Sequence, residues 1–160
     1  MFANNQTLND GETAIEIMAF TLHEQAYCVR TRSIREIRSY SPATPVPHAP
    51  PEVMGIMNLR GSVIPVVDLA AKLGMARIQP DERCAIIVAE VADFAIGLVV
   101  DRVSDILSIS PSDVQPMPDI RVLGAGEYSD GIVIQPNGIN CFLSLDRMFA
   151  NFDATIAKAA

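Results

Sequence analysis

Four side chains have the chemistry of a catalytic nucleophile or base: Cys28, His48, Ser62 and Asp68. Covalent catalysis needs a nucleophile beside a base that a third group orients. None of the four lies in a sequence motif that predicts such a group. His48 lies in a proline-rich stretch, where a solvated imidazole is the ordinary role. We therefore predict no catalytic residue and no enzyme activity, and keep a small hydrolase using Cys28 or Ser62 as an alternative.

The sequence predicts no metal site and no cofactor. The three cysteines, Cys28, Cys84 and Cys141, are far apart, and the chain has only two histidines. No CxxC or HExxH spacing and no glycine-rich phosphate loop occurs. Widely spaced cysteines in apolar runs indicate reduced core thiols of a cytoplasmic protein, with a reactive thiol as the alternative.

The strongest chemical signal is a group of four arginines within nine residues: Arg30, Arg32, Arg35 and Arg38. The chain around them is acidic, with a net charge of −7. A guanidinium fork matches the geometry of a carboxylate, so the group indicates a docking surface for a protein partner; a solvated strand face is the alternative. The acidic excess argues against binding to nucleic acid or to an anionic membrane.

A polar corner between two apolar runs is predicted to organise the fold. The stretch 55–69 reads GIMNLRGSVIPVVDL, in which Asn58, Arg60 and Gly61 have turn chemistry and β-branched residues follow. This pattern predicts a hairpin with Arg60 projecting from its corner. Pro65 cannot donate a backbone hydrogen bond, so we expect it at a sheet edge, a bulge or a barrel corner.

Helix signals are few and short. Asp68 is a predicted N-cap of one short helix that ends at Gly74, and Asp146 is a predicted cap of a last helix over residues 147 to about 157. Residues 33–40 fit either one helical turn or an irregular strand. Five prolines within residues 41–54 predict an extended surface connection, with a proline-rich ligand motif as the alternative.

The chain is long enough for one domain with a sizeable core, and 49% of its residues are hydrophobic. We expect a disordered tail over residues 1–13, a folded domain over 14–152 and a second tail over 153–160. The N-terminus has no signal-peptide pattern and no apolar run is long enough to span a membrane, so we expect no membrane insertion. About ten short strands without βαβ alternation favour a sandwich or barrel.

Three stretches together resemble the CheW-like coupling proteins of bacterial chemotaxis. They are the corner motif GxxNLRGxVIPVVDL, the preceding IREI at residues 34–37 and the later IGLVVDRVSDIL at residues 96–107. Their order and spacing fit the family over about residues 15–152. The resemblance implies a mainly β fold of two small five-stranded SH3-like barrels side by side, with short helices and a C-terminal helix. Lobe one would cover about 22–85, and lobe two about 86–145 with the first strand and the last helix.

The resemblance also implies a non-enzymatic adaptor that joins the signalling tip of a chemoreceptor, a methyl-accepting chemotaxis protein, to a CheA-type histidine kinase. Other CheW-like domains are further candidate partners. Candidate residues fall into three sets: Ile34, Glu36, Ile37 and Val99 for the receptor; Asn58, Leu59 and Arg60 for the kinase; and Gly55, Gly61 and Gly97 as structural glycines. Glu36 and Arg60 are expected to lie close together or to share a partner-facing surface, with an ordinary ion pair that fixes the corner as the alternative.

Two departures from the family pattern bear on partner identity. Ala70 stands where the family often has arginine, and Arg30-Thr31 replaces a usually more apolar strand end. If these positions lie near partner surfaces, the chain would serve a non-chemotaxis chemosensory array instead. An SH3- or OB-type barrel that binds nucleic acid is the other alternative, although the chain has no tryptophan and few aromatic residues.

Overall fold

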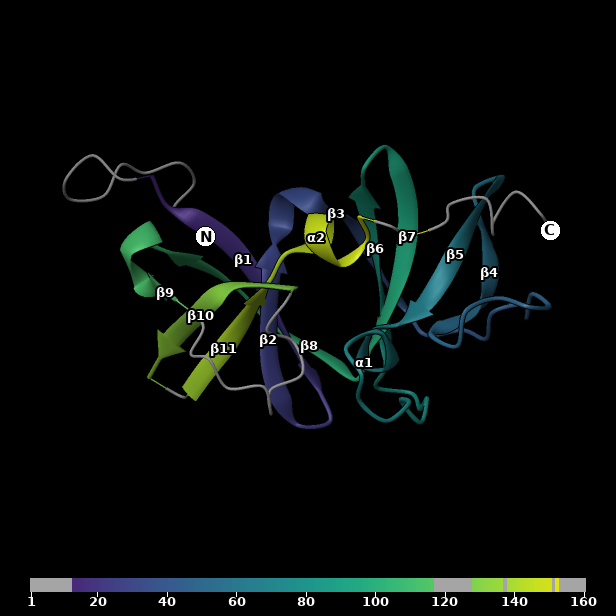
Figure 1. The fold of residues 1–160 in the computed structure, drawn as a ribbon, viewed down its shortest axis with the longest axis horizontal. Coiled ribbons are helices and arrows are strands. Elements are labelled where there is room, and N and C mark those ends of the chain that lie inside the picture. The colour runs from purple at the N-terminus through teal and green to yellow at the C-terminus, as the bar shows by residue number, and fades with distance from the viewer. Residues whose placement is uncertain (1–12, 117–127, 137, 151, 153–160) are drawn as a thin grey trace.

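Two mixed β-sheets lie side by side in the computed structural model, which describes residues 13–116, 128–136, 138–150 and 152 (Figure 1). The first sheet has six strands in the order β8-β1-β2-β11-β10-β9. Its strands are β1 (Ile15–Leu22), β2 (Gln25–Arg30), β8 (Arg102–Ile109), β9 (Val114–Gln115), β10 (Ser129–Gln135) and β11 (Gly138–Leu143).

The second sheet has five strands in the order β3-β6-β7-β5-β4. They are β3 (Ile34–Ser39), β4 (Val53–Leu59), β5 (Ser62–Asp68), β6 (Ala85–Val91) and β7 (Phe94–Val100). The helices are single turns: η2 (Thr31–Ser33), α1 (Leu69–Lys72), η3 (Pro111–Asp113) and α2 (Leu145–Met148). Among the described residues, no helix has the length and apolar character needed to cross a membrane.

One hydrophobic core joins the two sheets. It includes Phe20 and Tyr27 from the first sheet, Ile86 and Leu98 from the second, and Phe149 just after α2, which lies between the sheets in Figure 1. A smaller core on the other side of the first sheet is built from Ile17, Cys28, Ile109, Val133 and Phe142. Because the larger core is shared, the two sheets are parts of one packed body and not domains joined by a linker.

The expected mainly β fold with short helices is confirmed, but strand pairing corrects the expected lobe boundaries. β2 falls in the range predicted for lobe one, yet it pairs with β1 and β11 of the first sheet. β6 and β7 were expected in lobe two, but they join β3 and β5 in the second sheet. The reason is two parallel pairings, β2 with β11 and β5 with β7, between strands that are distant in the sequence.

Two further expectations can be compared with the structure. Pro65, expected at a sheet edge, a bulge or a barrel corner, lies in β5, which is between β7 and β4 in the sheet order. The pairing of β5 with β7 starts one residue later, at Val66, so Pro65 is paired only with β4 and its missing donor is tolerated. The last helix begins at Leu145 with Ser144 as its N-cap, in place of Asp146. That helix was expected to run to about 157, but it ends at Met148 with Phe149 as its C-cap. Residues 153–157 lie outside the described residues, as do the expected tails except Thr13.

Residues 34–39 form a strand and not a helical turn, which settles the ambiguity of this segment. The register of β3 against β6 shifts between Ile34 and Glu36, so Arg35 is the extra residue of a bulge. After the bulge, alternation places Glu36 and Arg38 on one face of the strand and Ile37 on the other. β3 is an edge strand of its sheet. The bulge therefore sets which side chains this edge presents to each side.

The proline-rich stretch runs along the other edge of the second sheet. Thr44 and Ile56 exchange two backbone hydrogen bonds, with N···O distances of 2.9 and 2.8 Å. Gly55 next to this bridge has a φ of 151°, and a Cβ atom at this position would lie 2.2 Å from the carbonyl oxygen of Thr44. Only glycine fits such a close backbone approach, so Gly55 lets the segment cover the edge of β4.

Candidate docking site

The corner between β4 and β5 is a tight turn formed by Arg60 and Gly61. Both residues have positive φ angles, 51° and 88°, as the two-residue turns that match the twist of a hairpin require. The side-chain oxygen of Asn58 accepts a hydrogen bond from the backbone N–H of Gly61 at 2.9 Å. The predicted hairpin is thus confirmed. Its geometry projects Arg60, whose side chain is 73% exposed.

Glu36 on β3 joins this corner to the edge of the sheet. One oxygen of its carboxylate accepts a hydrogen bond from Nη1 of Arg60 at 2.5 Å, and the other accepts one from Nη1 of Arg38 at 3.2 Å. These two guanidinium groups, Arg60 first, lower the pKa of the Glu36 carboxyl. We call Glu36, Arg38 and Arg60 the corner triad. It carries two positive charges and one negative charge, and confirms the expectation that Glu36 and Arg60 lie close together.

The bulged residue Arg35 makes a separate ion pair. Its Nη2 and Nε atoms lie 2.6 and 2.7 Å from the same oxygen of Glu90 on β6. Both side chains are about half exposed, so the pair contributes little to stability. Its structural effect is to hold the Arg35 side chain across the neighbouring strand β6.

A hollow of about 780 Å³ lies beside the corner, which we call the corner hollow. Its wall combines two arginines, one acidic side chain and one serine with apolar residues: Arg35, Arg60, Asp93, Ser62, Leu59, Val63, Ile64, Pro65, Ala92, Phe94 and Ala95. Val63 contributes exposed aliphatic surface to this wall, with 43% of the residue accessible. A surface with exposed apolar groups and flanking guanidinium groups has the chemistry of a protein-docking site.

The residues predicted to contact a receptor separate into exposed and buried ones. Ile37 is 44% exposed and Ile34 is partly buried, both on the edge strand β3. Val99 is fully buried in the interior strand β7, so it cannot be a surface contact, and this expectation is wrong. Glu36, predicted for the receptor, contacts Arg60, predicted for the kinase. Ile37 faces the opposite side of β3 from Glu36.

The residues predicted to contact a kinase also differ in exposure. Asn58 and Arg60 are exposed, whereas Leu59 is only 7% exposed and packs in the core. Leu59 still lines the corner hollow. The predicted structural glycines are each explained by their surroundings: Gly55 by the bridge described above, Gly61 by the turn, and Gly97 by a close contact. A Cβ atom on Gly97 would lie 3.0 Å from Cγ2 of Ile86.

The candidate catalytic residues do not come together in a site. Cys28 is fully buried, and burial raises the pKa of its thiol to about 12, so it is an inert core residue. Asp68 is also buried and has two structural bonds: it caps α1 through the N–H of Ala71 at 3.1 Å and accepts the N–H of Ile78 at 2.9 Å. Among the residues that the structure describes, no group of three or more His, Cys, Asp or Glu side chains could hold a metal.

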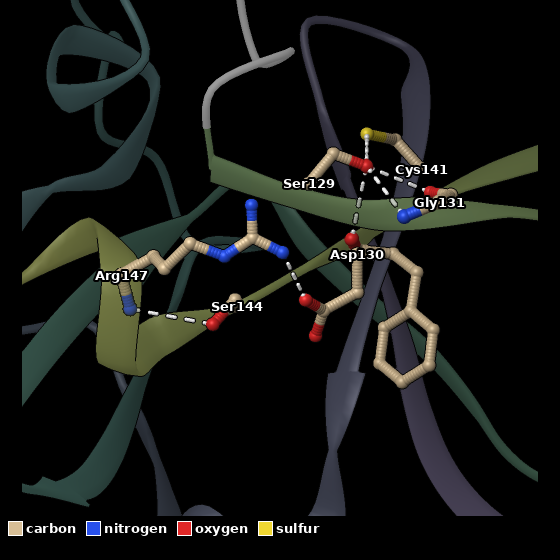
Figure 2. A network of polar contacts seen from close by, with 7 residues as sticks. Ser129, Asp130, Gly131, Cys141, Ser144 and Arg147 are labelled. Atoms are coloured by element: carbon tan, nitrogen blue, oxygen red, sulfur yellow. Dashed lines mark hydrogen bonds and ion pairs between the residues drawn. The ribbon is translucent and has the colours of Figure 1, made fainter. Parts of the chain in front are cut away.

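Sequence reasoning missed a polar network that fastens α2 to β10 (Figure 2). The Ser129 hydroxyl accepts a hydrogen bond from the N–H of Gly131 at 3.0 Å and lies 2.8 Å from that residue's carbonyl oxygen. Asp130 lies at the register shift between Ser129 and Gly131, and its carboxylate pairs with the guanidinium of Arg147. The only sequence signal is Ser-Asp-Gly, which predicts turn chemistry and not this pairing.

The sequence of the chain matches a known protein family. Residues 16–152 match the family model described as CheW-like domain. The chain belongs to the CheW-like family. It is 45% identical over 134 residues to the "Chemotaxis protein CheW" of Rhizobium meliloti (strain 1021), which covers 84% of this chain and 86% of the relative. It is 40% identical over 152 residues to the "Probable chemotaxis protein CheW" of Rhizobium etli, with coverage of 95% and 97%.

A solved CheW structure has the same fold. The crystal structure of the scaffolding protein TtCheW from Thermoanaerobacter tengcongensis matches with a TM-score of 0.79 and 26% identity, over 88% of this chain and 97% of that one. The resemblance, the mainly β fold and the class of a chemotaxis scaffold that is not an enzyme are thereby confirmed. CheW-like membership decides against the hydrolase and the nucleic-acid-binding barrel.

Both departures from the CheW-like pattern lie within the described part of the structure. Ala70 is fully buried in α1, so the change from arginine at this position does not lie on an exposed surface. Arg30 lies at the end of β2, with its guanidinium 5.5 Å from the centroid of the Phe142 ring. Thr31 follows it and donates a hydrogen bond to the carboxylate of Glu16 at 2.7 Å. Both contacts have structural roles within the first sheet and the turn after it.

Proposed function

We propose that the protein is a cytoplasmic adaptor that couples the signalling tips of chemoreceptors to a CheA-type histidine kinase. It acts by binding alone. The observation that carries the proposal is the edge strand β3, which presents a charged face with the corner triad on one side and the aliphatic side chain of Ile37 on the other. One strand with two different faces suits a protein that holds two partners at once.

The receptor tip binds at the Ile37 side of β3 in this proposal. Ile37 is 44% exposed and Ile34 on the same strand is partly buried. The two side chains therefore offer aliphatic surface that a partner can bury. A helical hairpin of a receptor can place its own apolar stripe against such a strand. Burial of the exposed aliphatic surface supplies the affinity.

The kinase binds at the corner hollow in this proposal. Arg60 and Val63 are exposed there, Leu59 and Phe94 form part of the wall, and Asn58 is exposed in the adjoining turn. Apolar side chains with an arginine at the rim are typical of the centre of a protein interface. Other CheW-like domains are further candidate partners for the same surface, because the regulatory domain of a CheA-type kinase is expected to share this fold.

The test is reconstitution from purified parts. The full chain is mixed with a receptor signalling fragment and a CheA-type kinase of the same organism, and complexes are separated by size-exclusion chromatography. We expect a ternary complex, with receptor-dependent change of kinase autophosphorylation. The charge-reversal variant Arg102→Glu is the matched control, because Arg102 is exposed on β8, an edge strand of the other sheet. Absence of binding to either partner would overturn the proposal.

A further inference from the structure

The corner triad has more positive charge than its own carboxylate can neutralise. Glu36 offers two oxygens, and each is taken by a different arginine, Arg60 at 2.5 Å and Arg38 at 3.2 Å. A guanidinium has five N–H donors in a planar fork. Each arginine uses a single donor on Glu36 in this arrangement. One further carboxylate would balance the charge of the triad and could accept from the remaining donors of Arg60, whose side chain is 73% exposed.

The two arginines differ in how they reach Glu36. Arg38 lies two residues along the same strand, so regular alternation places it on the same face as Glu36. Arg60 comes from a corner 24 residues away in the sequence. The contact of Arg38 with the carboxylate therefore lies within strand β3, whereas the ion pair of Glu36 with Arg60 joins β3 to the turn between β4 and β5. The exposed fraction of the side chain rises from 22% for Glu36 to 41% for Arg38 and 73% for Arg60.

We propose that the corner triad is a binding site for a partner carboxylate, in which Arg38 is a positioning residue that fixes Glu36 so that Arg60 presents its free donors. The ligand class is an acidic side chain next to an apolar one on the docking partner. The apolar side chain would enter the corner hollow beside Val63, and the carboxylate would meet Arg60. This inference rests on the proposed function only for the identity of the partner.

The surroundings of Glu36 make this assignment specific. Arg60 and Arg38 are the two charged groups that act on the Glu36 carboxyl, and both favour its ionised form. Arg35, between Ile34 and Glu36 in sequence, is instead engaged with Glu90. Of the four arginines recognised in the sequence, Arg38 thus contacts Glu36 of the corner triad, whereas the bulged Arg35 contacts Glu90 on β6.

The first arm of the test uses the free protein. Carboxyl carbon NMR of the labelled chain follows the titration of Glu36 in wild type, Arg38→Gln, Arg38→Lys and Arg35→Gln. We expect Arg38→Gln to raise the pKa of Glu36, Arg38→Lys to restore it in part, and Arg35→Gln to leave it unchanged. An unchanged Glu36 titration in Arg38→Gln would overturn the positioning role. The readout does not depend on any partner.

The second arm measures affinity for the purified regulatory domain of a CheA-type kinase at several salt concentrations. We expect Arg38→Gln to weaken binding on the order of threefold and to make its salt dependence shallower, while Arg102→Gln changes neither. A raised Glu36 pKa with unchanged affinity and salt dependence would overturn the capture of a partner carboxylate. If wild type does not bind the kinase domain, the proposed function and the capture step are both overturned, and the titration still decides the role of Arg38.

Discussion

The ammonium group of Lys72 lies 5.5 Å from the centroid of the Phe149 ring, and this contact joins α1 to the residue after α2. The same ammonium lies 5.6 Å from the ring centroid of Tyr128 and 3.9 Å from a carboxylate oxygen of Glu52. Only 17% of the Lys72 side chain is exposed. A largely desolvated cation between two aromatic rings is held more firmly than one on an open surface. Lys72 thus ties the second sheet to the C-terminal segment that packs between the sheets.

Replacing Lys72 by Met tests this tie. Met keeps the apolar stem of the side chain but removes its charge, so the cation–π contacts and the pair with Glu52 are lost. We expect the free energy of unfolding to fall by about 1–2 kcal/mol, measured by urea denaturation with circular dichroism. Lys72→Arg keeps a cation over the rings and serves as the matched control. Equal stability of Lys72→Met and wild type would contradict the assignment.

Two glycine substitutions separate a steric requirement from a conformational one. Gly55→Ala places a Cβ atom against the carbonyl oxygen of Thr44. In Gly61→Ala the Cβ atom meets no other atom within 4 Å, and the cost comes only from the positive φ that alanine must adopt. We expect Gly55→Ala to cost about 2–3 kcal/mol and Gly61→Ala about 1 kcal/mol. Thermal unfolding of both variants checks the order. A smaller effect at Gly55 would show that the proline-rich segment can move away freely.

Charge reversal at Arg60 tests the corner as a docking surface. Arg60→Glu sets two carboxylates against each other beside Arg38, and like charges at close range disfavour the arrangement seen here. We expect the fold to persist, because the Arg60 side chain is 73% exposed, while binding to the kinase is lost. Arg60→Lys keeps the charge without the planar fork and should bind weakly. Full binding by a folded Arg60→Glu variant would remove this corner from the functional surface.

Receptor affinity should depend more on Ile37 than on the exposed arginine Arg35. Ile37→Ala removes aliphatic surface that a partner would bury, at a cost of about 1 kcal/mol, whereas Arg35 already pairs with Glu90 in a half-exposed setting. The measurement is affinity for a receptor fragment across ionic strength, for wild type, Ile37→Ala and Arg35→Ala. Steep salt dependence together with an unaffected Ile37→Ala variant would show that charge carries this contact.

The buried thiol of Cys28 predicts a loss of stability at alkaline pH. Burial raises its pKa from 9.0 to about 12, so the folded chain keeps a proton that the unfolded chain releases. The stabilisation is complete below about pH 9 and is lost as the pH rises toward 12. Urea midpoints of wild type and Cys28→Ala at pH 8 and pH 10 measure it as the difference between the two proteins. A parallel pH dependence in both would argue against this origin.

Local signals in the sequence predicted the elements around the corner well. Asn58 and Gly61 encode the turn directly through their backbone preferences, and the capping role of Asp68 follows from its position before an apolar turn. The closeness of Glu36 and Arg60 was predicted from opposite charges and from the resemblance. Its geometry was not predictable, because it depends on the bulge at Arg35 and on the pairing of β3 with β6.

Pairings between distant strands account for most of the errors. The run around Val99 is apolar throughout, and such a run is equally consistent with a surface strand of a groove and a strand buried on both faces. The pairing of β7 with both β5 and β6 decides for burial. The division of strands between the sheets depends on the parallel pairs β2–β11 and β5–β7, which leave no local signal in the sequence.

The bridge between Thr44 and Ile56 has a consequence for self-association. Strands at the edge of a sheet can accept a strand from another molecule, which is a common route to aggregation. The proline-rich segment occupies that place along β4, and its prolines cannot extend a ladder themselves. At the opposite edge, the bulge in β3 and its charged residues discourage flat stacking of a second chain. The same bulge and charges that shape the proposed docking surface thereby work against edge-to-edge pairing between two copies of the chain.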